Sequence, residues 1–190
     1  MSLVVHLLGR PSLERDSGDA YQFRSRKSWA VLAYLILSER SPTRSTLAAL
    51  LFAEASDPLR ALRWNLAEIR RGIGDEGSID GDPVVLRLPP GTIVDVSQVT
   101  SGSWVTAIEL PGLDAELLEG LTVRDAAAFE SWLLSQQRHV AAAAEAILHE
   151  AALGSLSLRS DSSQPSDRRS RRNSASHPVL RSRLRCVRRG

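Results

Sequence analysis

The sequence of 190 residues predicts an α+β fold in two parts, and three observations support this prediction. Within residues 1–98, short strand-like segments stand on either side of three helical segments. The third of these helices has a regular apolar stripe. Residues 99–154 are rich in alanine and acidic residues, which favours a mostly helical second part.

Two short strands are predicted near the N-terminus, over residues 3–8 and 20–23, because β-branched or aromatic side chains lie there between turn residues. Apolar side chains are almost continuous from residue 28 to 37, which indicates a helix buried on most sides. Thr43 is the expected N-cap of a second helix that reaches Leu51.

A third helix is predicted to begin after Asp57, with Pro58 at its first position. Its apolar residues are spaced three and four apart, so we expect one core-facing stripe: Leu59, Leu62, Leu66, Ile69 and Ile73. The helical wheel places a second set on the opposite face: Arg60, Trp64, Ala67, Glu68 and Arg71. Arg63 and Arg70 lie on one flank of the stripe.

A β-hairpin is predicted after this helix, with strands over residues 84–88 and 92–96 joined by a Pro-Pro-Gly turn. Three helices followed by a hairpin is the arrangement of a winged helix-turn-helix domain. In such a domain the third helix enters the major groove of DNA and the hairpin contacts the phosphate backbone.

The second part is predicted to contain a short amphipathic helical turn over residues 114–121 and a long helix from about Asp125 to Leu153. The long helix has apolar residues at helical spacing: Phe129, Trp132, Leu133, Val140, Ala144, Ile147 and Ala151. Because this stripe needs a cover, we expect it to pack on the winged helix or on a second copy of the chain.

The net charge of +2 conceals an uneven distribution. Residues 155–190 contain ten Arg and two Asp, a charge of +8, so the body carries −6. This Arg/Ser-rich segment has two interpretations: a disordered basic arm that strengthens nonspecific DNA binding, or the product of a shifted reading frame.

Two groups of residues resemble a known family. Thr43-Arg44 through Leu51-Phe52, together with Leu66-Ala-Glu-Ile-Arg-Arg-Gly-Ile73, are similar to the OmpR/PhoB-type winged helix of the Streptomyces antibiotic regulatory protein (SARP) family. Glu116-Leu-Leu-Glu-Gly-Leu121, Phe129-Glu-Ser-Trp-Leu133 and Arg138 are similar to the start of the bacterial transcriptional activator domain (BTAD). The resemblance covers roughly residues 3–153, and the activator domain stops after about one long helix.

The resemblance implies a DNA-binding transcriptional regulator, an activator, that binds direct-repeat promoter DNA. It also implies tetratricopeptide-like helix pairs that form a homodimer or contact RNA polymerase. The DNA contacts that it implies are Arg60, Arg63, Trp64, Arg70 and Arg71, with the hairpin around Arg87 as the wing. Glu68 departs from the family pattern, in which this place on the third helix often has a basic or neutral residue. On the exposed face its carboxylate would repel phosphate.

Three further basic residues lie near predicted helix starts, where they suit either phosphate contact or simple solvation: Arg26, Lys27 and Arg44. No enzyme, cofactor or metal site is expected, since His149-Glu150 is followed by Leu153 instead of the second histidine of HExxH. The absence of a signal peptide or apolar span, with Cys186 as the single cysteine, favours a cytoplasmic protein. The alternative function is a helical protein-protein adaptor whose winged-helix-like part does not bind DNA.

Overall fold

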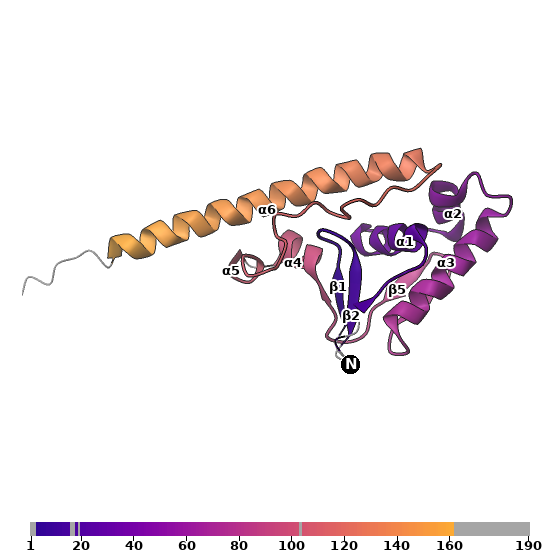
Figure 1. Ribbon diagram of the computed structural model, residues 1–190, viewed down its shortest axis with the longest axis horizontal. Helices are drawn as coiled ribbons and strands as arrows, with labels where there is room; N and C mark the ends of the chain where they lie inside the picture. The colour runs from indigo at the N-terminus through magenta and orange to yellow at the C-terminus, as the bar shows by residue number, and fades with distance from the viewer. Residues whose placement is uncertain (1–2, 16–17, 19, 103, 162–190) are drawn as a thin grey trace, which may run out of the picture.

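A computed structural model describes residues 3–15, 18, 20–102 and 104–161, without the side chains of residues 104 and 154–161. The elements follow the order β1 (Leu3–His6), β2 (Ser12–Arg15), β3 (Ala20–Tyr21), α1 (Arg26–Leu37), α2 (Arg44–Phe52), α3 (Pro58–Ile73), β4 (Ser78–Asp80), β5 (Val85–Arg87), β6 (Ile93–Val94), α4 (Asp95–Ser101), α5 (Trp104–Ala107) and α6 (Ala127–Asp161). The predicted α+β class is confirmed. Figure 1 shows α3 along one outer edge of the molecule and α6 along another.

The larger sheet has the strand order β3-β2-β1-β6. β1 pairs with β2 in antiparallel register, Val5 opposite Leu13, and with β6 in parallel register, Val5 opposite Val94. The strand β2 was not expected from the sequence, because its Ser-Leu-Glu-Arg pattern is short and has a single apolar residue. Leu13 is nevertheless fully buried, so one side chain anchors the strand to the core.

The helices α2 and α3 begin at the predicted caps, and α1, α2 and α3 share the predicted apolar core. Thr43 Oγ1 accepts a hydrogen bond from the Thr46 amide, and Asp57 Oδ1 accepts one from the Arg60 amide, which places the starts of α2 and α3 as expected. The helices pack through a shared apolar core in which α3 contacts both α1 and α2. The orientation of α3 is therefore set by two neighbouring helices.

The predicted hairpin is wrong in one of its strands. β5 lies within the expected first strand, but its partner is the upstream β4, with Ser78 opposite Arg87. The expected second strand turns away at Pro89 and becomes β6, which joins β1 instead. The reason is Asp95, whose buried carboxylate accepts hydrogen bonds from the amides of Leu7 and Leu8 at 2.9 Å and so holds this segment beside β1.

The segment 114–121 is not the expected helical turn. It runs beside the end of β1, where the Leu118 amide donates to the Leu7 carbonyl at 2.7 Å and the Gly9 amide donates to the Glu116 carbonyl at 2.8 Å. Leu117 and Leu118 are both buried, which two consecutive residues on one side of an amphipathic helix cannot easily achieve. The unpaired backbone groups beyond β1 thus find their partners in this segment.

The long helix was correctly predicted as an element, although its ends differ. α6 begins at Ala127 and continues to Asp161, so it includes the first seven residues of the expected Arg/Ser-rich segment, 155–161. The rest of that segment lies outside the described residues. α6 packs on α2, α4 and α5 and buries Phe129, Leu133 and Val140, so elements of both parts of the chain cover much of its apolar stripe.

The division at residue 98 stays a prediction, and in the structure that position lies inside α4. The tetratricopeptide-like pairing also stays a prediction, because α6 is the only long helix after α3 in the described part of the chain. In the same residues, no helix has the length and apolar content needed to cross a membrane.

Candidate nucleic-acid interface

The exposed face of α3 exists because the opposite face is held in the core. Leu62, Leu66, Ile69 and Ile73 are buried as the periodicity predicted. Leu59 was expected to join them but is 49% exposed, because the first turn of α3 extends beyond the packed core. Trp64 is 66% exposed, which is unusual for so large an apolar side chain.

Three side chains on this face make no hydrogen bond or ion pair with the residues that the structure describes. Arg60, Arg63 and Trp64, with Ala67, line a shallow hollow of about 300 Å³ on the surface of α3. Within the described residues, neither the Arg60 nor the Arg63 guanidinium forms a hydrogen bond or an ion pair. Their charges are therefore available to an external anion.

Arg70 and Arg44 differ from these residues because both contact the β4–β5 hairpin. Arg70 Nη2 donates to the Ile79 carbonyl at 2.5 Å and lies 3.3 Å from Asp80 Oδ1. Arg44 Nε donates to the Gly81 carbonyl, and the Arg44 amide donates to Asp82 Oδ1, both at 2.9 Å. These two arginines fix the hairpin relative to α2 and α3.

Arg71 and Arg87, the remaining residues of the expected interface, are exposed. Arg71 Nε is 3.4 Å from the Ala67 carbonyl one turn earlier, a long hydrogen bond that leaves most of its donors free. Arg87 lies in β5, so the hairpin that carries it is β4–β5 and not the predicted one. The structure thus places the expected residues on α3, on the hairpin and at the start of α2.

Glu68 is buried, contrary to its expected position on the outer face. Its side chain is 7% exposed and accepts hydrogen bonds from the Arg24 amide at 2.7 Å and from Ser28 Oγ at 2.5 Å. The carboxylate therefore joins α3 to the start of α1. Since it does not reach the exposed face of α3, the expected repulsion of phosphate by this group is removed.

Two other basic candidates also have internal partners. Lys27 Nζ donates to the Leu51 carbonyl at 2.6 Å and lies 5.0 Å from the centre of the Phe52 ring, so it joins α1 to α2. Arg26 Nη1 donates to Thr122 Oγ1 at 2.9 Å, which ties α1 to the segment that precedes α6. Only the tertiary structure distinguishes these residues from Arg60 and Arg63.

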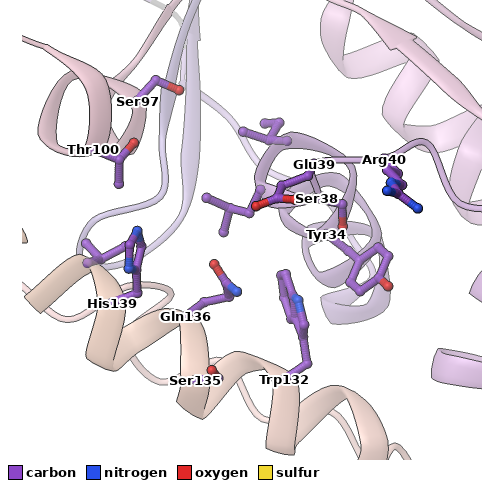
Figure 2. A pocket seen from close by; sticks show the side chains of 13 residues that line it. Tyr34, Ser38, Glu39, Arg40, Ser97, Thr100, Trp132, Ser135, Gln136 and His139 are labelled. Atoms are coloured by element: carbon purple, nitrogen blue, oxygen red, sulfur yellow. The ribbon is translucent and has the colours of Figure 1, made fainter.

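An open cavity of about 700 Å³ lies between the end of α1, α4 and α6. Figure 2 shows Trp132, Gln136 and His139 of α6 on one side of it and Tyr34 and Glu39 on the other. The Tyr34 and Trp132 rings are in contact, with centroids 4.7 Å apart. None of the lining residues belongs to α3, so the cavity is separate from the arginine face. In the described residues no cluster of His, Cys, Asp and Glu could hold a metal ion.

Comparison with solved structures shows a similar fold in Mycobacterium tuberculosis EmbR, determined in complex with a low-affinity phosphopeptide. The TM-score is 0.50 with 20% sequence identity, and the match covers 84% of this chain and 50% of EmbR. This chain therefore spans about half the length of that protein. No protein-family model matches the sequence, and no curated protein is similar to it at a significant level. The comparison confirms the winged-helix fold.

Proposed function

We propose that the protein is a DNA-binding transcriptional regulator that inserts α3 into the major groove of promoter DNA. The observation that carries this proposal is the exposed set Arg60, Arg63 and Trp64 on a helix whose opposite face is locked into the core. A rigid helix with unpaired guanidinium groups can present them to base edges and phosphates without losing an internal contact. The fold that the chain shares with EmbR is consistent with this role.

The hairpin would act as the wing. Arg70 and Arg44 hold β4–β5 at a defined position beside α3, so Arg87 can contact a phosphate while α3 occupies the groove. Phosphate contacts would position the protein, and a few arginine contacts with bases would provide sequence specificity. The proposal includes no catalytic step. In it, α6 provides the surface for RNA polymerase or a second copy. Contact with RNA polymerase would make the regulator an activator.

Fluorescence anisotropy with labelled duplex DNA tests the proposal on the chain of 190 residues. We expect Arg63→Ala to weaken binding by about tenfold at low salt and to reduce the slope of log K against log[salt] by about one. The matched control is Arg10→Ala, because Arg10 is exposed but lies in the bend between β1 and β2, away from α3. Both proteins keep the Arg-rich C-terminal residues, so their contribution cancels. Equal binding by the two variants would contradict the proposal.

The adaptor function is favoured by one observation, the exposure of Leu59 and Trp64 on the same helix. Apolar and aromatic side chains on a surface are typical of protein interfaces. An adaptor that keeps the Arg-rich residues 155–190 would still bind duplex DNA in a salt-dependent way, but Arg63→Ala would weaken that binding no more than Arg10→Ala. The difference between these two variants therefore separates the two functions.

A further inference from the structure

The open cavity between the end of α1, α4 and α6 is not used by the proposed function. Its volume of about 700 Å³ falls in the range of about 300–1,000 Å³ that is usual for sites of small organic ligands. The last turn of α1 with the following residues 38–40, residues of α4 and one face of α6 line it. Because none of these residues lies on α3, a ligand in the cavity would leave the arginine face open.

Several polar groups border this cavity without a partner in the described part of the chain. Figure 2 shows the Gln136 side chain extending from α6 toward the open space, and the Glu39 side chain bordering that space from the other side. Neither group forms a hydrogen bond or an ion pair with the described residues, and the same holds for the Trp132 indole N–H and the His139 ring. Their hydrogen-bonding capacity is therefore available to a ligand.

The charge around the cavity favours a cation. The carbonyls of Ile36 and Leu37, at the end of α1, accept no hydrogen bond from the described residues. Free carbonyls at a helix C-terminus carry partial negative charge, and α1 has no basic residue in its last turn to compensate it. The Glu39 carboxylate adds a full negative charge at the same end of the helix. Figure 2 shows the Arg40 side chain apart from those of α6, so its charge lies away from that side of the cavity.

The aromatic and apolar lining indicates what else the ligand contains. The Tyr34 and Trp132 rings are in contact at an interplanar angle of 51°, and both residues line the cavity. The face of an indole or phenol ring attracts a cation that lies within about 6 Å of its centre. Leu37 and Val140 provide apolar contacts in the same cavity. A carboxylate close to aromatic rings and apolar side chains suits an ammonium ion with an apolar body.

We propose that this cavity binds a small organic cation, an ammonium group carried by an apolar or aromatic body. The ammonium group would lie among Glu39, the end of α1 and the Trp132 ring, where its N–H groups can donate to the carboxylate and to the free carbonyls. The body would contact Leu37 and Val140, and Gln136 would bind a polar substituent. The bound cation would thus join the end of α1 to α6.

Nuclear magnetic resonance of the ¹⁵N-labelled chain of 190 residues tests the site with 2-phenylethylammonium as the probe. The four tryptophans give four indole N–H signals, and Trp132→Phe and Trp64→Phe identify two of them. We expect the Trp132 signal to shift saturably, with a dissociation constant of about 1 mM or lower for a probe of this size. The Trp64 signal, on α3, should stay in place. No saturable shift of the Trp132 signal up to about 20 mM, or an equal shift of both signals, would overturn the proposal.

Two probes of similar shape separate the effect of the charge from that of the ring. 2-Phenylethanol lacks the charge, and 3-phenylpropionate carries the opposite one. We expect the alcohol to bind at least about fivefold more weakly than the ammonium ion. The carboxylate probe should give no saturable shift, because Glu39 and the end of α1 repel it. Equal or tighter binding of either probe would show that the cavity does not select a cation.

Glu39→Gln tests the residue that provides the full negative charge. This variant should bind 2-phenylethylammonium about fivefold more weakly, a modest factor because Glu39 is exposed and solvent screens its charge. Its binding of 2-phenylethanol should be unchanged. Glu130→Gln is the matched control, since Glu130 is exposed on α6 but does not line the cavity. Equal affinity of the two variants for the ammonium ion would contradict the proposal. No DNA is present in these measurements, so their failure is distinguishable from a failure of the proposed function.

Discussion

Arg60 and Arg63 near the start of α3 have a different task from Arg70 near its end. Arg60 and Arg63, in the first half, are exposed and unpaired within the described residues, whereas Arg70 in the second half holds the Ile79 carbonyl and Asp80. The difference arises because the β4–β5 hairpin returns beside the end of the helix and not beside its start. The same residue type on one helix thus supports either ligand binding or domain architecture, according to what lies next to it.

The largest expected effect concerns Glu68, which lies in the second half of α3. Glu68→Ala removes the acceptor of the Arg24 amide and one of the two acceptors of the Ser28 hydroxyl, which keeps Asn65 Oδ1 at 2.8 Å. We expect the free energy of unfolding to fall by about 2–4 kcal/mol in chemical denaturation. Glu54→Ala, at an exposed carboxylate, should change it by less than about 0.5 kcal/mol. A similar small effect for both variants would show that Glu68 is not structural.

A smaller effect on the free energy of unfolding is expected to distinguish Arg70 from Arg60. Arg70→Ala should lower the free energy of unfolding by about 1 kcal/mol, because it removes the contact with the Ile79 carbonyl at a half-exposed position. It should also increase amide hydrogen exchange in β4 and β5. Arg60→Ala should leave both measurements unchanged. Faster exchange in the hairpin of the Arg60 variant would remove the distinction between the two halves.

The smallest effect concerns Asp95, the first residue of α4, which directly follows β6. Burial raises the pKa of Asp95 above 3.8, although the amides of Leu8, Leu7 and Val96 oppose the shift. A raised pKa means that the folded protein binds the proton of Asp95 more tightly than the unfolded chain does. Protonation of Asp95 therefore adds to the free energy of unfolding; this contribution is complete below pH 3.8 and is lost as pH rises through the folded pKa.

Asp95→Asn provides the comparison for this titration. The free energy of unfolding of the wild-type protein, relative to Asp95→Asn, should therefore increase as the pH is lowered from 7 toward 4. Denaturation curves at several pH values measure this difference, and the contribution of groups that titrate alike in both proteins cancels. A difference that stays constant or decreases toward low pH would contradict the burial of a costly charge at this position.

Much of the candidate site could be predicted from local pattern. The caps at Thr43 and Asp57 and the apolar spacing of α3 identified the helices and most of the exposed arginine face. The wheel placed Glu68 on the outer face and was wrong, because a polar side chain opposite the apolar stripe can still be buried when a neighbouring element offers hydrogen-bond donors. Ser28 and the amide of Arg24 are distant in sequence, so nothing near Glu68 indicated this burial.

The strand pairing was less predictable than the helices. A Pro-Gly turn between two apolar segments is compatible with a local hairpin, but β6 pairs instead with β1 at the other end of the domain. Hydrogen bonds between strands depend on residues far apart in the chain, whereas helix hydrogen bonds are local. The same reason explains the segment 114–121, whose partners are the backbone groups of Leu7 and Gly9.

The sequence by itself determined the α+β class, the three-helix core and the long amphipathic helix, because caps and periodicity act within a few residues of one another. Only the tertiary structure decided which strand completes the hairpin, which arginines are free and which hold it, and which residues of α1 and α6 line one cavity. Those properties depend on which side chains the folded backbone brings together, and that proximity is set by long-range packing.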